Sequence, residues 1–323
     1  MMQRSILFFL FFLTGTVAGS AQVCCSNMRD LGNKAYQKGN YDEAIRLYKK
    51  GQGCGDAAGC SDLASLINKA IIAQENANSK PSPQKNKQTT PSPKESATVS
   101  TPFVDPVMVK VEGGSFQMGS NDGSNSEKPI HSVSVNTFYI GKYEVTQSEW
   151  RSVMGKNPPK LYFKGCNSCP VDAVSWDNIQ EFLKKLNAKS EKTYRLPTEA
   201  EWEFAARGGN KSNGYTYSGS NDLKSVAWCY ENSDSKTHPV GQKQANELGL
   251  HDMSGNVWEW CTDWYKGYPG SSGVKDYTGS DRVYRGGGCF YDAGYCRVAS
   301  RSYNTPAYRY SLLGFRLAIS FPQ

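Results

Sequence analysis

The densest group of chemically active side chains lies in residues 249–264, which read Gly-Leu-His-Asp-Met-Ser-Gly-Asn-Val-Trp-Glu-Trp-Cys-Thr-Asp-Trp. Asp252 and Glu259 enclose a Gly/Asn turn there, and Ca²⁺ binds carboxylate oxygens together with the carbonyls of irregular loops. A buried Glu259 could instead be neutralised by an arginine from the C-terminal region. The candidate arginines are Arg297, Arg301 and Arg316. The segment therefore predicts either a calcium site or a buried ion pair.

Cysteines form a second group, and the chain has ten of them. Cys289 and Cys296 follow an Arg-Gly-Gly motif, and two thiolates are ligands that soft Cu(I) prefers. The alternative for each is a disulfide. Cys166 and Cys169 read Cys-Asn-Ser-Cys, but no second ligand pair completes a zinc site, and Pro170 follows where a redox cysteine would open a helix. This loop pair predicts a structural disulfide.

The three histidines of the chain show no ligand spacing. His131, His238 and His251 lie far apart, and none belongs to a His-x-x-x-His arrangement. We therefore expect each to be a core or surface side chain and not a metal ligand. The sequence also contains no phosphate-binding loop and no nucleophile elbow.

The N-terminus predicts export. Arg4 precedes an apolar run at residues 6–12 and small residues at 18–21, which is the pattern of a signal peptide over residues 1–21. No later apolar run reaches about 18 residues, so we expect no integral membrane span. The mature chain would be periplasmic, cell-surface or extracellular, where cysteines form disulfides. The net charge is +7, but no dense Lys/Arg block favours nucleic acid as a partner.

The rest of the chain divides into three parts. Residues 22–75 carry small and aromatic residues at helical spacing around a Gly-Asn turn and resemble one tetratricopeptide unit; a small disulfide-stapled helical hairpin without a binding role is the alternative. Residues 76–106 are rich in Pro, Ser, Thr and Lys and are expected to be a disordered linker. Residues 107–323 form the main domain.

The main domain has the pattern of an α+β fold. Alternating apolar residues over 109–118 and 131–139 predict short strands. Three hydroxyl residues stand where helices should begin, and we expect them to be N-caps: Thr146, Ser175 and Thr198. Long Gly/Asn/Ser loops connect these elements, so the domain should contain little regular structure.

Ordered motifs run through the same domain. They are Gly113-Gly-Ser-Phe-Gln-Met-Gly119, Tyr143-Glu-Val-Thr146, Pro170-Val171, Val174-Ser-Trp176, Arg195-Leu-Pro-Thr-Glu-Ala-Glu-Trp-Glu203, Gly255-Asn-Val-Trp-Glu-Trp260, Arg285-Gly-Gly287 and Gly314-Phe-Arg316. In this order they resemble the formylglycine-generating enzyme (sulfatase-modifying factor) family, from about residue 107 to residue 318. The resemblance implies a single α+β domain related to C-type lectins.

The resemblance leaves the activity open. The family's oxidases convert a cysteine of sulfatases to formylglycine with O₂ and a copper ion held by two cysteines, whereas many bacterial members lack this site. The copper-binding positions would fall near Gly288 and Ala293. Cys289 and Cys296 occupy neither of them, and their spacing is wider than the family's. This departure argues against an oxidase and against copper as a cofactor.

The resemblance also implies a structural calcium ion in residues 249–264. Its ligands would be the carboxylates of Asp252 and Glu259 and the main-chain carbonyls of Gly255 and Val257. This set agrees with the preference of Ca²⁺ for hard oxygen ligands.

Two long-range disulfides follow from the same comparison. Relatives are expected to carry aromatic residues where Cys229 and Cys289 stand, and this joint replacement implies a bond between these two. Cys261 and Cys296 would then form the second bond.

Aromatic and arginine side chains crowd the C-terminal third, where the oxidases bind an extended peptide. The residues expected to line such a groove are Trp258, Trp260, Tyr295, Arg297, Arg301 and Tyr303. Tyr, Trp and Arg are typical of interfaces, although core packing is the alternative for these aromatics. We therefore expect an exported, non-catalytic domain that binds a protein, peptide or glycan. The alternative is a copper-dependent oxidase acting on a cysteine of sulfatase-type substrates.

Overall fold

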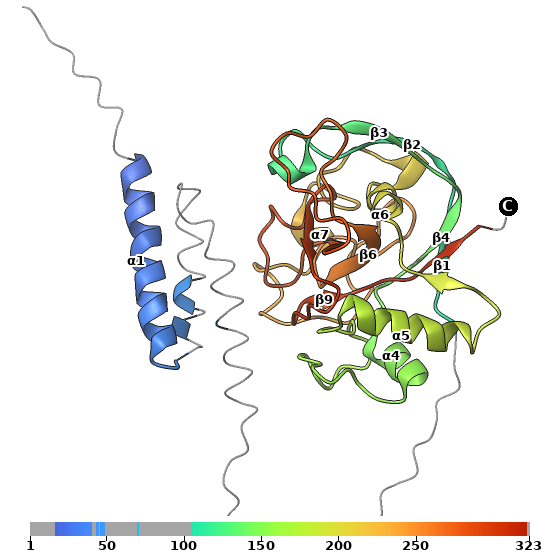
Figure 1. Cartoon of the computed structure of the whole chain (residues 1–323), viewed down its shortest axis with the longest axis horizontal. Coiled ribbons are helices and arrows are strands. Elements are labelled where there is room, and N and C mark those ends of the chain that lie inside the picture. Colours follow the sequence, from blue (N-terminus) through green and yellow to red (C-terminus); the bar gives the residue numbers. More distant parts are fainter. Residues whose placement is uncertain (1–16, 41–42, 45, 49–69, 71–104, 322–323) are drawn as a thin grey trace, which may run out of the picture. The chain divides into compact units, whose positions relative to one another are not determined.

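The computed structural model describes residues 17–40, 43–44, 46–48, 70 and 105–321, and the chain divides into two units, Met1–Glu95 and Ser96–Gln323 (Figure 1). In these parts of the chain, no helix combines the length and the apolar character needed to cross a membrane. Most of the predicted signal peptide and linker lies outside the described residues.

The first unit contains helix α1 (Val17–Gln37), followed by a turn at Gly39. Residues 43–44 and 46–48 are helical as well. The Tyr48 hydroxyl donates to Asn33 Oδ1 at 2.7 Å, and a Cβ on Gly32 would clash with the Tyr48 ring. A small residue in α1 therefore permits the aromatic ring to pack against it. Much of the segment predicted to resemble a tetratricopeptide unit lies outside the described residues.

The second unit combines short helices, short strands and long loops. Its helices are η1 (Asn125–Glu127), α4 (Gln147–Met154), α5 (Trp176–Asn187), α6 (Glu199–Ala206), η2 (Gly209–Lys211) and α7 (Leu223–Val226). Its strands are β1 (Met108–Val111), β2 (Gly114–Met118), β3 (His131–Val135), β4 (Phe138–Gly141), β5 (Tyr194–Arg195), β6 (Trp258–Trp264), β7 (Arg282–Arg285), β8 (Arg301–Asn304), β9 (Leu313–Gly314) and β10 (Ala318–Ser320). This composition confirms the predicted α+β class.

The three predicted N-caps are confirmed. Thr146 Oγ1 accepts from Glu149 N at 3.2 Å, and Glu149 Oε2 accepts from Thr146 N at 2.7 Å, which is a reciprocal capping box at the start of α4. Ser175 and Thr198 cap α5 and α6 in the same way. The helices therefore begin where the sequence indicated, because a cap is determined by residues that are close together in the chain.

The strands form three sheets with the orders β1-β4-β10-β5, β2-β3 and β8-β7-β6-β9. In the last sheet β6 pairs antiparallel with β7 and parallel with β9. The β2-β3 ribbon curves around the upper edge of the second unit in Figure 1, whereas α4 and α5 lie together at its lower edge. Strand β6, which ends the segment 249–264, thus lies at the centre of the second unit.

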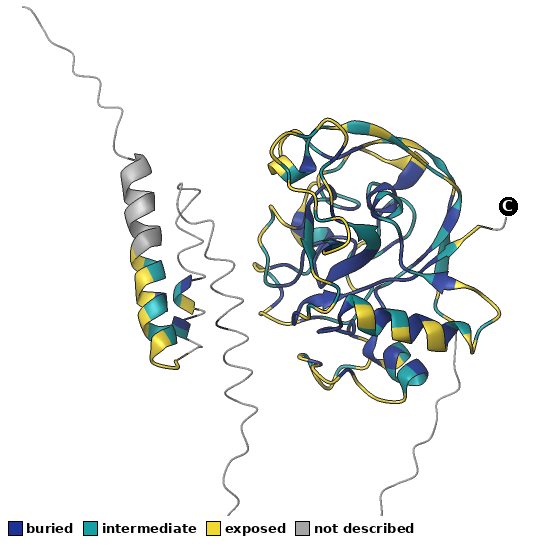
Figure 2. Cartoon of the chain, in the orientation of Figure 1, coloured by how far each residue is buried: buried dark blue, intermediate teal, exposed yellow. Residues whose placement is uncertain are grey.

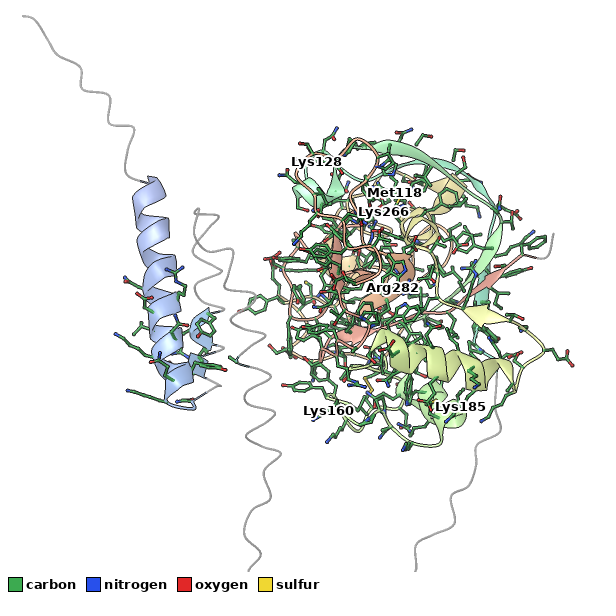
Figure 3. The ribbon with its side chains drawn as sticks, viewed as in Figure 1. Met118, Lys128, Lys160, Lys185, Lys266 and Arg282 are labelled. Carbon is green, nitrogen blue, oxygen red and sulfur yellow. A yellow bond between two sulfur atoms is a disulfide. The ribbon has the colours of Figure 1, made fainter. Side chains whose placement is uncertain are left out.

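The core gathers around β6 and α6, where Figure 2 shows a continuous buried interior. Its largest fully buried side chains include Trp202, Trp260 and Phe315. Basic side chains are spread around the outside: Lys128 lies at the top of Figure 3, and Lys160 and Lys185 lie at the bottom.

Buried ion pairs tie α6 to β7 and β8. The Glu199 carboxylate accepts from Arg285 Nε at 2.8 Å and from Arg301 Nε at 2.7 Å. Arg285 also binds Glu203 at 2.8 Å. Burial alone would raise the pKa of Glu199, but the two guanidinium groups outweigh it and hold this pKa below its ordinary value.

Candidate functional site

Glu259 at the start of β6 forms a buried ion pair with Arg316. Arg316 Nε donates to Glu259 Oε2 at 2.6 Å, and Trp202 Nε1 donates to the same oxygen at 2.6 Å. The second oxygen, Oε1, accepts from the other end of the Arg316 guanidinium. Burial alone would lower the pKa of Arg316, but Glu259 raises it above its ordinary value. A calcium ion or an arginine was predicted as the partner of Glu259, and the structure shows Arg316 in this position.

Two further buried carboxylates flank this pair. Asp252 Oδ2 accepts from Gly241 N at 2.7 Å, whereas the buried Oδ1 accepts no hydrogen bond from the described residues. Burial raises the pKa of Asp252 to about 6. Glu144 accepts from Asn256 Nδ2 at 2.7 Å and from Val257 N at 3.0 Å, and burial together with the charges of Asp252 and Glu259 raises its pKa.

The predicted calcium ligands fit a cation only in part. Asp252 Oδ1 is a buried oxygen that accepts no hydrogen bond from the described residues. Such an oxygen is free to bind a metal ion. Glu259, however, already accepts from Arg316 and Trp202 with its two oxygens. Within the described residues, no three His, Cys, Asp or Glu side chains are grouped as a metal site. The main-chain positions Gly255 and Val257 lie in the same buried turn.

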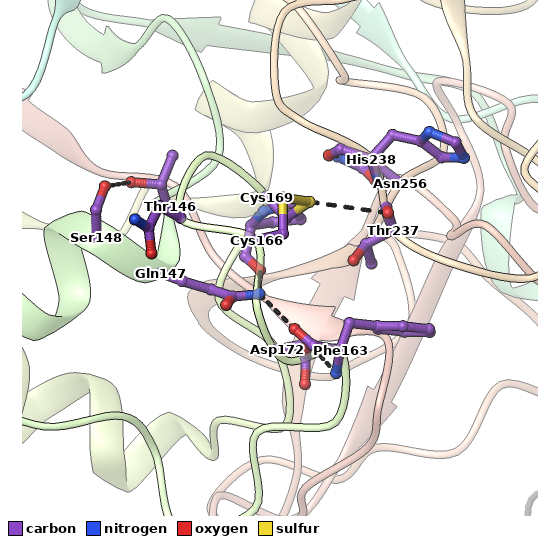
Figure 4. Close-up of a disulfide and its surroundings, with 12 residues drawn as sticks. Thr146, Gln147, Ser148, Phe163, Cys166, Cys169, Asp172, Thr237, His238 and Asn256 are labelled. Atoms are coloured by element: carbon purple, nitrogen blue, oxygen red, sulfur yellow. Dashed lines mark hydrogen bonds between the residues drawn. A yellow bond between two sulfur atoms is a disulfide. The ribbon is translucent and has the colours of Figure 1, made fainter.

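The Cys166–Cys169 disulfide is confirmed, and it closes the loop before α5 (Figure 4). Gln147 N donates to the Cys169 carbonyl at 2.9 Å. The Asp172 carboxylate accepts from the backbone amides of Tyr162 and Phe163 at 2.6 and 3.1 Å. The disulfide and Asp172 therefore hold a loop that carries two adjacent aromatic side chains.

The structure does not contain the other two predicted disulfides, and it shows Cys229, Cys261, Cys289 and Cys296 as buried thiols. The Cys261–Cys296 prediction is wrong for a topological reason. Strand β6 carries Cys261 into the cluster of Trp202 and Val283, whereas Cys296 packs beside Cys229 in a separate cluster. The predicted Cys229–Cys289 bond is likewise absent.

The structure buries both candidate copper ligands, Cys289 and Cys296. Burial raises the pKa of the Cys296 thiol above its ordinary value. Cys296 packs with Cys229 in an apolar cluster.

The predicted groove residues mostly belong to the core. Trp258, Trp260 and Arg301 are buried, and Arg301 is bound to Glu199. Three more positions were expected in the groove: Tyr295, Arg297 and Tyr303. Arg297 forms an ion pair with Glu127 at 2.7 Å, and the Tyr303 ring packs on Tyr265 at 3.9 Å. Tyr295 alone of the six is exposed. The sequence could not separate core from groove residues here, because an aromatic or arginine side chain in an aromatic-rich segment can point either into the core or toward solvent.

A different set of aromatics is exposed. Tyr162, Tyr230 and Tyr295 have exposed fractions of 37%, 49% and 39%. Ring contacts extend from Tyr162 through Phe163 to Phe290, since the Tyr162–Phe163 and Phe163–Phe290 ring centroids lie 4.8 and 5.8 Å apart. We call the surface formed by Tyr162, Phe163, Tyr230, Phe290, Tyr291 and Tyr295 the tyrosine surface.

Tyr291 contacts both the Tyr295 ring and the Tyr230 backbone. Its ring centroid lies 5.1 Å from that of Tyr295, and its carbonyl accepts from Tyr230 N at 3.0 Å. The buried Trp258 lies beneath it, with a centroid distance of 5.4 Å. Tyr162 and Tyr230 were not predicted from the sequence, although each stands beside a polar turn.

The three histidines have separate surroundings. His131 Nδ1 lies 3.1 Å from the Pro129 carbonyl, and His251 Nδ1 lies 2.9 Å from the Lys243 carbonyl. His238 stacks on Trp228 with a centroid distance of 3.7 Å. Each ring is thus positioned by packing and by a backbone contact.

Known proteins share this architecture. The family model of the sulfatase-modifying factor enzyme 1-like domain matches residues 94–321. The chain is 40% identical over 208 residues to the chaperone protein LppX of Paenibacillus barcinonensis, covering 49% of this chain and 71% of that protein. It is 29% identical over 283 residues to the formylglycine-generating enzyme of Streptomyces coelicolor, covering 65% of this chain and 88% of the enzyme.

Solved structures agree with this assignment. Treponema denticola variable protein 1 superposes with a TM-score of 0.60 at 34% identity, over 66% of this chain and 95% of that chain. This neighbour supports the predicted fold related to C-type lectins and formylglycine-generating enzymes. The family match covers more than half of the chain, and its motifs form the core and the ion pairs described above. The chain therefore belongs to the family that contains the sulfatase-modifying factor enzyme 1-like domain.

Proposed function

We propose that this protein is an exported, non-catalytic binding protein, and that the tyrosine surface binds a peptide segment of a partner protein. The observation that carries the proposal is that three exposed tyrosines lie on loops that share ring contacts and main-chain hydrogen bonds. Tyrosine offers a large amphipathic contact area with few rotatable bonds, which is why it is enriched in binding hot spots. Trp258 beneath Tyr291 and Asp172 beneath Tyr162 limit the entropy lost on binding.

The thiols support a non-catalytic role. An oxidase of this family would need two cysteines that bind copper next to its substrate, and both Cys289 and Cys296 are fully buried. Two relatives, the chaperone protein LppX and variable protein 1, carry names that are not those of oxidases. The Cys166–Cys169 disulfide suits the oxidising compartment to which the N-terminal pattern would direct the chain.

Peptide binding can be tested with a display library selected against the full-length protein. We expect selected peptides to bind at least about 10-fold more weakly when Tyr162, Tyr230 and Tyr295 are all replaced by alanine. The matched control is Phe321→Ala, because Phe321 is exposed to a similar extent but stacks on Tyr139. Equal binding by the triple variant would contradict the assignment of the surface. A glycan-array signal that only the triple variant loses would change the class of partner.

The oxidase alternative has its own assay. Full-length protein incubated with Cu(I) and a cysteine-containing sulfatase peptide should consume no more O₂ than Cu(I) and the peptide do without the protein. Copper-dependent turnover that disappears in Cys289→Ser and Cys296→Ser would overturn the proposal of a non-catalytic domain.

A further inference from the structure

Cys229 and Cys296 meet in one small apolar cluster. Their exposed fractions are 1% and 0%, and the remaining buried members of the cluster come from α7 and the residue after it. These are Leu223, Val226 and Ala227. The two cysteines are far apart in the sequence, so the fold itself brings them together.

The turn at residues 254–256 donates hydrogen bonds to the backbone at or next to both cysteines. Ser254 Oγ donates to the Cys296 carbonyl at 2.7 Å, and Asn256 N donates to the Trp228 carbonyl, adjacent to Cys229, at 2.8 Å. Cys229 N in turn donates to Asn232 Oδ1 at 2.9 Å. Both segments are thus anchored to residues 254–256 by hydrogen bonds to their main-chain carbonyls.

The Cys296 sulfur is confined on the side of Gly287. A Cβ built on Gly287 would lie 2.8 Å from Cys296 Sγ, which is closer than real Cβ atoms approach a sulfur. The sulfur therefore packs directly on the Gly287 backbone, and the apolar cluster with Cys229 lies around it.

We propose that Cys229 and Cys296 are joined by a disulfide in the oxidised protein. One Sγ–Sγ bond forms, and each thiol loses one proton and one electron. The two electrons reduce the disulfide of an external oxidant, either oxidised glutathione or a thiol–disulfide oxidoreductase, to two thiols. One protein sulfur first attacks the oxidant, and the second then displaces the reduced oxidant from the mixed disulfide.

Burial determines when this reaction occurs. The pKa values of both thiols are raised because desolvation disfavours the thiolate, and thiolates are the attacking species in disulfide exchange. The bond should therefore form while the chain folds and, once enclosed, resist reduction. Cys261 stays a thiol, because it lies in the cluster of Trp202 and Val283.

The bond would also connect two parts of the tyrosine surface. Tyr230 follows Cys229, and Tyr295 precedes Cys296. A covalent link between the two cysteines fixes the distance between the two exposed side chains, which lowers the entropy lost when a partner binds. This consequence rests on the proposed function, whereas the bond itself does not.

The direct test is disulfide mapping of the full chain. The reduced, unfolded protein is refolded in a buffer of reduced and oxidised glutathione, denatured in iodoacetamide, digested without reductant and analysed by mass spectrometry. We expect one peptide pair linked through Cys229 and Cys296, and carbamidomethylated Cys261. Alkylated Cys229 and Cys296 in protein that contains the Cys166–Cys169 bond would overturn the proposal, as would a Cys229–Cys289 link.

A stability measurement supplements the mapping. Replacing Cys229 and Cys296 together by alanine should lower the melting temperature of the oxidised protein by about 5 °C or more. The same double substitution should have a much smaller effect when both proteins are kept in reductant during folding. Cys261→Ala is the matched control, and it should leave the Cys229–Cys296 peptide pair in place. Because mapping needs no partner, a missing bond and a failure of the tyrosine surface to bind peptide are separate outcomes.

Discussion

Arg316 neutralises Glu259 at the centre of the second unit, where neither side chain is exposed to solvent. The pair joins β6 to the segment just before β10, where Arg316 lies. Arg316 Nη1 also donates to the Gly141 carbonyl of β4 at 3.0 Å. A single guanidinium thus links β6 and β4, which belong to two different sheets.

Removing this guanidinium should destabilise the fold strongly. Arg316→Met would leave the Glu259 carboxylate buried without its cation, and we expect a loss of about 3–5 kcal/mol in the free energy of unfolding. Chemical denaturation measures this value. The control is Lys185→Ala, which removes the exposed Lys185–Glu181 pair and should cost about 1 kcal/mol or less. Similar losses in the two variants would contradict the role assigned to Arg316.

The pH dependence should show the contribution of Glu199. Arg285 and Arg301 hold its pKa below the ordinary value despite burial, so the unfolded chain binds the proton more readily than the folded chain. The stability from the Glu199 carboxylate is full above the unfolded pKa and is lost as the pH falls through the folded pKa. The difference in unfolding free energy between the wild type and Glu199→Gln should therefore be constant from about pH 6 to pH 8 and shrink below about pH 4.5. A difference that grows on acidification would refute this assignment.

Asp252 should show the opposite sign. Burial raises its pKa to about 6, so the folded state favours the protonated form, and stability is lost as the pH rises through this value. Asp252→Asn removes the charge and retains an oxygen for Gly241 N. In EDTA, we expect the stability of this variant relative to the wild type to rise from about pH 4 to about pH 6 and to stay constant above about pH 7. Parallel stability profiles for the two proteins would show that the charge of Asp252 is compensated in another way.

Calcium can be tested at the same residue. Because Asp252 Oδ1 is buried without a donor, we expect Ca²⁺ to raise the melting temperature of the wild type at pH 8, and EDTA to reverse the change. Asp252→Ala should abolish the response. An equal response in that variant would place the ion elsewhere, and no response in the wild type would mean that the Arg316 pair alone satisfies Glu259.

Gly287 offers a test of packing around Cys296. Gly287→Ala would place a methyl group against Cys296 Sγ and the Tyr295 carbonyl, at a residue whose φ is +77°. Gly249→Ala is matched in backbone conformation, since φ is +80° there, but no atom lies within 4 Å of the added Cβ. Both variants incur the strain of a left-handed residue, and the difference between them should be about 1–3 kcal/mol from overpacking. Denaturation curves that coincide would show that the Cys296 region is loosely packed.

The helix starts were predictable from the sequence because a capping box is local. Thr146 and Glu149 lie three residues apart, and their spacing alone specifies the geometry. The partner of Glu259 was predictable only as one of three arginines, because the choice depends on how the chain returns to β6. The fold brings Arg316 there, while Arg297 and Arg301 bind acids elsewhere in the second unit.

The site was less predictable than the fold. Trp258 and Tyr291 belong to the same aromatic-rich region, yet the first is buried and the second is partly exposed. Composition cannot separate them, since their burial is set by residues far away in the chain. The predicted Cys261–Cys296 disulfide was wrong for a similar reason. Cys261 lies on β6 and Cys296 lies in the loop after Gly288, and the two residues belong to different apolar clusters.

The loops that carry the tyrosine surface are anchored through main-chain atoms. Tyr230 N binds the Tyr291 carbonyl, Ser233 Oγ binds the Cys289 carbonyl, and Ser254 Oγ binds the Cys296 carbonyl. None of these bonds uses the side chain of an exposed tyrosine. Side chains at positions such as 230 and 295 can therefore be exchanged while the anchoring bonds persist, so that one scaffold can carry many alternative recognition chemistries.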